Sequence, residues 1–411
     1  MSHDHTVLRD LASRYAAIAA DPVMAQRREL WADHLSLKPT RPLLTLCSGI
    51  WDQWVAQALA PANLSCQDPE LRQVERDLRY LIMLHSYGSD DIAEPWISVP
   101  FVRKHTMWGH AWQSHDHGDE GAYKLSEPIA TWADMAKLVP PVHEVDEAAS
   151  RRRWDKVEEA LGGTLVLDRQ RIPECVTFAG DIATDLGRLH GIERSMIEMA
   201  EDPEGLTKLI EVLRDGILEN LRQAEAAGDF CLTSGLNQTM TYSRELPWPK
   251  ANTPATPGQI WGHCAAQEFT GVSPRQHQRF LLANQLPIVS RYGLLAYGCC
   301  EDMTHKITML RQVPNLRMIA VAPTANLAKC CAQIGTDYVV SWRPNPSDTV
   351  CGPRWDAERV RTLLRAGLES ARGTRLHIML KDVYTLHGDE DRLRRYHDIA
   401  REEIARAGWS C

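Results

Sequence analysis

Apolar residues recur at two different spacings along the chain, and the change from one spacing to the other predicts the fold. Spacings near 3.6 residues predict helices in the first part of the chain, at residues 5–36, 69–87, 131–138 and 145–161. Short apolar runs predict buried strands at residues 41–47 and 93–99. From about residue 160 such runs alternate regularly with helical segments, with strands predicted at 164–168, 228–234, 294–296, 316–321, 337–342 and 376–380.

Regular alternation of strands and helices with short connections is typical of a parallel sheet. About seven or eight strands in one run favour a closed barrel over an open sheet. We therefore predict an α/β protein, a (β/α)8 TIM barrel with an N-terminal helical extension. Residues 1–160 form a helical and loop elaboration packed on the barrel, and residues 161–411 form its main body. Residues 103–123 have no clean periodicity and predict a long loop, such as often covers an active site.

Composition and charge narrow the class of protein. The 411 residues are 44% hydrophobic and 24% charged, as in ordinary soluble globular proteins. A net charge of −8 argues against nucleic acid or an anionic membrane as the main partner. The first residues lack a signal pattern, and no apolar run is long enough to span a bilayer. Eleven cysteines, an odd number with two adjacent pairs, do not resemble a disulfide framework and favour the reducing cytoplasm.

A barrel brings the carboxyl ends of all its strands to one face, and reactive side chains are concentrated at these predicted ends. Several ionisable groups facing one cavity are hard to explain structurally, because burying them unpaired is costly. The polar or turn residues that we place on this rim are Asp168, Ser234, His263, Gln267, Cys299, Cys300, Glu301, Pro323, Arg343, Asn345, Lys381 and Asp382.

The stretch at residues 292–302 is the centre of the rim, because two thiols and a carboxylate directly follow a strand and a glycine. Side chains at i and i+2 of a strand point the same way, so Cys299 and Glu301 are expected to converge. Cys299 and Cys300 are expected to diverge unless the backbone bends. Zinc accepts such ligands: Cys299 with Glu301 or Cys300, completed by His263 or Asp382. The alternative is that the cysteines are inert buried side chains.

A set of short motifs resembles the uroporphyrinogen decarboxylase superfamily, in particular its members grouped with corrinoid-dependent methyltransferases. The resemblance covers roughly residues 160–410 and is carried by residues 261–262 with Gln267, 272–274, 297–301, 314–317, 337–339, 343–346 and 380–382. It implies a (β/α)8 barrel, in agreement with the alternation of elements.

The resemblance also bears on the metal. Zinc methyltransferases of this superfamily carry a His-x-Cys pair after a core strand and a further cysteine after a late strand. Cys299 matches the first cysteine, but Tyr297 stands in place of the histidine, and the late cysteine position falls near Lys381 and Asp382. The zinc site is therefore altered or lost, and Glu301 or Asp382 would have to substitute. The arginine-rich signature of true uroporphyrinogen decarboxylases is missing from residues 41–52, so decarboxylation in the haem pathway is not expected.

We predict from these features a zinc-assisted methyltransferase (demethylase) that moves a methyl group from a small methylated substrate to a thiol or to a separate corrinoid protein. A homodimer is also expected. The alternative is a metal-independent lyase or decarboxylase, in which Lys381 and Asp382 do acid–base work and Arg343 holds a carboxylate. The predicted catalytic residues are Lys381, Asp382 and Glu301; the metal ligands are Cys299, Glu301 and His263; the substrate-binding residues are Trp51, Trp108, Trp261, Gln267, Tyr297 and Arg343.

Overall fold

A six-stranded parallel sheet forms the centre of the molecule. The computed structural model describes residues 2–49, 52–104, 107–109, 114–116, 123–125 and 127–409. The strands of this sheet lie in the order β1-β10-β9-β8-β7-β6, and all neighbours are parallel. Their bounds are β1 Leu43–Cys47, β6 Trp261–Cys264, β7 Leu294–Tyr297, β8 Leu316–Val321, β9 Val339–Trp342 and β10 Arg375–Lys381.

Four further strands form two small sheets. β2 (Trp96–Pro100) pairs in parallel with β5 (Val166–Gln170), and β3 (Ser114–Asp116) pairs antiparallel with β4 (Tyr123–Leu125). The predicted α/β class with a parallel sheet is therefore confirmed. The first strand lies beside the last, as in a barrel, but among the described residues no strand ladder joins β2 and β5 to the six-stranded sheet. The sheet thus forms part of a barrel, and a closed eight-stranded barrel is not confirmed.

The two faces of the six-stranded sheet are buried against different partners. Side chains alternate between faces along each strand. On one face Leu44, Leu295 and Ile378 belong to the largest hydrophobic cluster of the protein, which also contains residues of the helices that connect the strands. On the other face Leu43 and Leu294 pack in a smaller cluster with Trp31 and other residues of the second helix. A sheet buried on both faces explains why its strands are continuous apolar runs.

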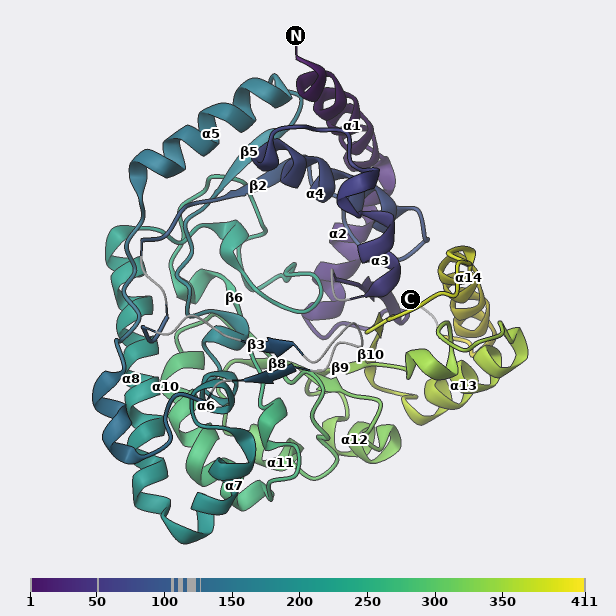
Figure 1. Ribbon diagram of the computed structural model, residues 1–411. Coiled ribbons are helices and arrows are strands. Elements are labelled where there is room, and N and C mark those ends of the chain that lie inside the picture. The colour runs from purple at the N-terminus through teal and green to yellow at the C-terminus, as the bar shows by residue number, and fades with distance from the viewer. Residues whose placement is uncertain are drawn as a thin grey trace.

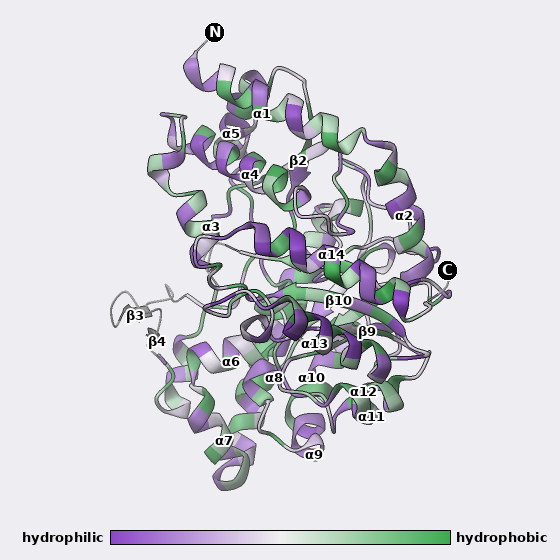
Figure 2. Ribbon diagram, turned by 90° about the vertical axis from the view of Figure 1, so that its right-hand side faces the viewer, coloured by the Kyte–Doolittle hydropathy of each residue, from purple (hydrophilic) through white to green (hydrophobic). Residues whose placement is uncertain are grey.

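The helices surround this sheet, as Figure 1 shows: α10 to α13 follow one side of it, and α1, α4 and α5 lie with β2 and β5 at the far end of the molecule. Several of the outer helices, α1, α2 and α7 among them, carry hydrophobic and hydrophilic residues in alternating bands (Figure 2). The α-helices are α1 His3–Ala19, α2 Pro22–Leu35, α3 Gln53–Ala58, α4 Pro69–His85, α5 Glu147–Leu161, α6 Ala183–Leu189, α7 Ile192–Glu201, α8 Pro203–Ala227, α9 Pro274–Gln276, α10 Ala283–Val289, α11 Ile307–Leu310, α12 Leu327–Ile334, α13 Ala357–Ser370 and α14 Asp391–Arg406.

Two predicted elements differ from the structure for local reasons. The predicted helix at 5–36 is two helices, because Asp21 caps a new helix by accepting the Val23 N–H and Pro22 occupies its first turn. The predicted strand at 228–234 is wrong: this segment makes a single-residue bridge from Cys231 to Pro254 and then a short 3-10 turn, Leu232–Ser234.

Close packing of α13 on β9 depends on a glycine. A Cβ atom at Gly367 would overlap the ring of Trp342. We expect Gly367→Ala to lower the free energy of unfolding by about 1–3 kcal/mol through overpacking. Helix propensity works in the opposite direction by about 1 kcal/mol, so a net loss would identify the overlap as the cause. Urea unfolding measures the effect. Gly271→Ala is the matched control, because a Cβ there meets nothing within 4 Å and should change stability by less than about 0.5 kcal/mol.

Candidate active site

Polar side chains collect at the carboxyl end of the sheet, on the face opposite the large helical cluster. Lys381 ends β10 beside Cys47 at the end of β1, and Arg343 directly follows β9. Four residues before Lys381 on the same strand, the buried ring of His377 is hydrogen-bonded on both sides, to Thr45 Oγ1 at 2.7 Å and to Ser341 Oγ at 3.1 Å. These bonds tie β1, β10 and β9 together and hold the ends of the three strands in place.

A bend at Gly298 brings Cys299 and Cys300 to the same point. Gly298 has φ +100°, a conformation that L side chains rarely adopt, and a Cβ there would lie 3.0 Å from Met303 and 3.1 Å from Ala320. The regular alternation of β7 therefore stops at this residue. The two sulfurs lie 3.5 Å apart, so the exception that the sequence analysis allows for a bent backbone applies to Cys299 and Cys300. The reason is the backbone bend, which periodicity alone does not reveal.

Lys381 faces both thiols. Its Nζ lies 3.0 Å from Cys299 Sγ and 3.3 Å from Cys300 Sγ. The same ammonium is 3.6 Å from Asp382, whose side chain is 66% exposed while that of Lys381 is 12% exposed. Cys299 is buried, whereas Cys300 is exposed. The structure thus pairs a half-enclosed ammonium with one buried and one exposed thiol, and leaves Asp382 at the edge of the group.

The electrostatic surroundings favour a thiolate at Cys299. Hydrogen bonding from Cys300 lowers the pKa of Cys299 most, and the charges of Arg343 and Lys381 lower it further, against the opposing effect of burial. The pKa of Cys300 is raised, first by its bond to Cys299 and then by burial. Burial lowers the pKa of His263 to about 4, so this imidazole is neutral at pH 7. Cys299 is therefore the thiolate of the pair, and Cys300 the thiol.

The Glu301 carboxylate binds backbone N–H groups, whereas the sequence predicts that it converges with the Cys299 sulfur. The carboxylate accepts the backbone N–H of Ala266 at 2.8 Å and that of Cys299 at 2.7 Å. Both oxygens are thus used to fix the turn that carries Cys299. Glu301 therefore holds the backbone of Cys299 in place.

Arg343 is also engaged by the protein. One terminal nitrogen donates to the carbonyl oxygen of Cys299 and the other to Gln238 Oε1. Gln238 comes from the segment between α8 and β6, and sequence analysis did not identify it. This segment has neither a helical nor a strand period, so its approach to the site leaves no signal in the sequence. Arg343 and Glu301 together hold the carbonyl and the N–H of Cys299.

The predicted aromatic substrate contacts lie elsewhere. Trp108 is buried in the large cluster, and its Nε1 donates to Asp185 at 2.8 Å. Trp261 is buried with Trp31 on the face of the sheet that also carries the site, but it begins β6 and so lies at the amino end of its strand. Tyr297 faces the helices, where its hydroxyl lies 2.8 Å from Gln285 and 3.1 Å from His277. Each of these three rings is in protein packing. Gln267 is half-buried at the start of a 3-10 turn, and Trp51 lies outside the described residues.

The predicted zinc ligands can be compared directly with this geometry. Cys299 has its sulfur beside an ammonium, Glu301 has both oxygens on backbone N–H groups, and His263 has Nε2 at 3.4 Å from the Gly298 carbonyl. Within the described ranges, no three His, Cys, Asp or Glu side chains are grouped to hold a metal ion. In this arrangement Cys299, Glu301 and His263 do not form the three-ligand zinc site that the sequence predicts. Zinc binding stays a prediction from sequence, and elemental analysis of wild type and Cys299→Ser tests it.

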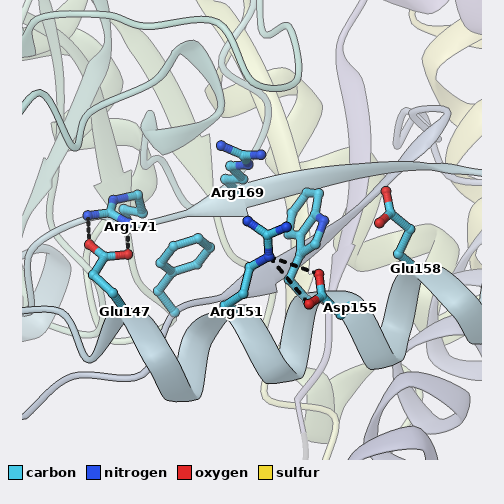
Figure 3. Close-up of a pocket in the computed structure, with 8 residues that line it drawn as sticks. Glu147, Arg151, Asp155, Glu158, Arg169 and Arg171 are labelled. Atoms are coloured by element: carbon cyan, nitrogen blue, oxygen red, sulfur yellow. Dashed lines mark hydrogen bonds and ion pairs between the residues drawn. The ribbon is translucent and has the colours of Figure 1, made fainter.

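A hollow of about 300 Å³ lies between α5 and the end of β5. Figure 3 shows its charged residues along one side of α5, with Arg169 and Arg171 facing them from the strand. Arg171 pairs with Glu147 at 2.6 Å, and Arg151 with Asp155 at 3.1 Å. Three arginines and three acids line it, so their formal charges cancel. Its lining residues include no cysteine, in contrast to the cluster at Cys299.

Comparison with known proteins adds little to this description. No protein-family model matches the chain, and no curated protein matches its sequence. Among solved structures, a methyltransferase from Methanosarcina mazei is similar over 92% of this chain and 98% of its own, at 11% identity and a TM-score of 0.49. A similarity this low carries neither fold nor function to the present chain. Within the described residues, no helix has the length and apolar character needed to cross a membrane.

Proposed function

We propose that this chain is a methyl-transferring enzyme in which Cys299 is the reacting thiolate and Lys381 is its cationic partner and proton donor. The observation that carries the proposal is the 3.0 Å contact between Lys381 Nζ and Cys299 Sγ at the carboxyl end of a parallel sheet. A thiolate, and not a thiol, is the nucleophile in cysteine chemistry, and a neighbouring cation stabilises it. The choice of a methyl group rests on the sequence resemblance.

The reaction follows from the positions of these two groups. The Cys299 sulfur attacks the methyl carbon of a small methylated substrate; a sulfur–carbon bond forms as the bond from carbon to the substrate heteroatom breaks. The leaving heteroatom keeps the electron pair and takes a proton from Lys381, which must lie within hydrogen-bond reach of it. An external thiol then returns a proton to Lys381, and its thiolate attacks the methyl carbon. A bond forms between the external sulfur and the methyl carbon, the bond from the Cys299 sulfur to that carbon breaks, and Cys299 leaves as a thiolate. A separate corrinoid protein is the alternative acceptor that the resemblance implies.

Two hydrogen bonds to the backbone of Cys299 suit its role as the nucleophile. Glu301 binds its N–H and Arg343 its carbonyl oxygen, so the backbone of the nucleophile is held from both sides. Prepositioning of a reacting atom lowers the entropic part of the barrier. The competing lyase reaction requires Arg343 to hold a substrate carboxylate, although each terminal nitrogen of this residue already donates one hydrogen bond within the protein. The preference for methyl transfer rests on the contact between the Lys381 ammonium and the Cys299 sulfur and on the sequence resemblance.

The proposal predicts a methylated enzyme. After incubation with small methoxy, methylthio and methylamino compounds carrying a labelled methyl group, we expect the tryptic peptide 292–306 to gain one labelled methyl group on Cys299. Cys299→Ser should abolish the label, and Cys300→Ser should retain it. Fragmentation in the mass spectrometer assigns the modified sulfur.

Label on Cys300, or label that persists in Cys299→Ser, would contradict the assigned nucleophile. Carbon dioxide release from carboxylated compounds, without any label on the enzyme, would instead support the lyase reaction.

A further inference from the structure

We propose that Cys299 and Cys300 form an oxidisable dithiol, which a hydroperoxide converts into a disulfide between adjacent residues. The feature that carries this inference is the 3.5 Å separation of the two sulfurs, one buried and one exposed, beside the Lys381 ammonium. The chemistry itself is independent of the proposed methyl transfer, and only its consequence for activity rests on that function.

The sulfurs are close enough for a small movement to join them. A disulfide bond is about 2.05 Å long, so the sulfurs have to approach by roughly 1.5 Å. Consecutive Cα atoms are about 3.8 Å apart, which is shorter than the usual separation of about 4.4–6.8 Å across a disulfide. The ring that closes is therefore strained, and we expect small dithiols to reduce it readily. Residues 299–301 lie in an irregular bend after Gly298, where the backbone is not restrained by a strand ladder.

The chain contains a second adjacent pair that serves as an internal comparison. Cys330 and Cys331 are both buried in helix α12. Successive side chains of an α-helix are rotated by about 100° from each other and do not face one another. The two pairs have the same sequence but a different backbone, so only Cys299 and Cys300 are expected to close.

The two sulfurs have different roles in the oxidation. The Cys299 thiolate attacks the terminal oxygen of the hydroperoxide; a sulfur–oxygen bond forms, the oxygen–oxygen bond breaks, and the leaving alkoxide or hydroxide takes the proton of Cys300. The Cys300 thiolate then attacks the Cys299 sulfenic sulfur. A sulfur–sulfur bond forms, and hydroxide departs as water with a proton from Lys381. Two thiols are oxidised, and one hydroperoxide is reduced to an alcohol, or to water, and a further water.

Closure of the dithiol removes the thiolate that Lys381 faces. If Cys299 is the methyl-accepting sulfur, the oxidised enzyme has no nucleophile and is inactive until a reductant reopens the bond. Oxidation at this site is thus a reversible modification that stops the proposed reaction.

The test uses the full chain and hydrogen peroxide. After treatment, alkylation of free thiols and tryptic digestion, we expect peptide 292–306 to lose two hydrogen atoms and to carry no alkyl group. Dithiothreitol should restore both alkylation sites. The Cys330 and Cys331 thiols should stay alkylated throughout. In Cys300→Ser, Cys299 should stop at the sulfenic acid, which dimedone traps, and in Cys299→Ser the remaining thiol should resist the same dose.

Lys381→Met provides a variant that keeps both thiols. It should slow the oxidation at pH values below the pKa of Cys299 in wild type, where the thiolate fraction falls by about tenfold for each unit by which that pKa rises. Urea midpoints of all variants confirm that they fold.

Three outcomes would overturn the inference: alkylation of both cysteines after peroxide, a dimer linked through Cys300, or equal oxidation of the Cys330–Cys331 pair. Methyl labelling of Cys299 without disulfide formation would refute the dithiol and leave the proposed function intact. Disulfide formation without methyl labelling would support the dithiol and contradict the proposed methyl transfer.

Discussion

Replacing Lys381 by methionine is expected to raise the pKa of the Cys299 thiol by about 1–3, because the ammonium at 3.0 Å stabilises only the charged form of the sulfur. Methionine keeps much of the length of the side chain and removes its charge. Cys300 and Arg343 also lower the pKa of Cys299, while burial raises it. Glu301 and His263, on the neighbouring segments, also interact electrostatically with Cys299. The pKa should therefore rise without returning fully to that of a free cysteine.

Ultraviolet absorbance of the thiolate, followed from about pH 4 to pH 9, measures this effect. Subtracting the titration of Cys299→Ser isolates the signal of Cys299 from those of the other cysteines. The midpoint of the difference curve should lie higher in Lys381→Met than in wild type. Lys329→Met, at an exposed position of α12, is the control and should leave the midpoint unchanged. Equal midpoints in wild type and Lys381→Met would show that the ammonium does not stabilise the thiolate.

The second large effect concerns stability and centres on Asp90. Its buried carboxylate accepts two hydrogen bonds from Arg41 at 2.8 Å, one from Arg401 at 3.0 Å and one from the Leu44 N–H at 2.9 Å. It thus connects β1 to the last helix, α14. Asp90→Asn removes the buried negative charge that Arg41 and Arg401 share, and we expect it to lower the free energy of unfolding by about 3 kcal/mol.

Acid should remove part of the same stabilisation. Burial is the largest influence on the pKa of Asp90 and raises it, but the bonds and charges of Arg41 and Arg401 prevail and lower the pKa to about 2, from 3.8. A carboxylate with a depressed pKa stabilises the fold fully above its unfolded value and loses this contribution as pH falls through the folded one. The contribution is about 2 kcal/mol, and it disappears between about pH 4 and pH 2.

Urea unfolding of wild type and Asp90→Asn across this pH range tests both statements, since the difference between them should shrink as the pH falls. Asp10→Asn removes an exposed ion pair with Arg14 and should cost less than about 1 kcal/mol at any pH. A difference between wild type and Asp90→Asn that stays constant down to pH 2 would mean that the charge of Asp90 contributes nothing, and that only its shape matters.

Periodicity determined most of the element types. The strand runs at 316–321, 337–342 and 376–380 are found as β8, β9 and β10, because strands buried on both faces must be continuously apolar. Helix α8 likewise carries its own signal in the sequence, in the Asp202 cap, in Pro203 at its first turn and in its regular apolar spacing. The segment at 228–234 was misread, since a short apolar run does not reveal whether a neighbouring strand is available to pair with it.

The sequence by itself also determined that Cys299, Glu301, Arg343 and Lys381 follow strand ends, and the parallel sheet brings these ends together. Only the tertiary structure decided their roles. The bend at Gly298 turned two expected divergent thiols into a pair, and sent the Glu301 carboxylate to backbone N–H groups. The packing of helices and strands also buries Trp108, Trp261 and Tyr297 in hydrophobic clusters. The physical reason is that spacing along a chain determines which face of an element a side chain occupies, whereas its partner depends on backbone bends and on segments distant in sequence, such as the one that carries Gln238.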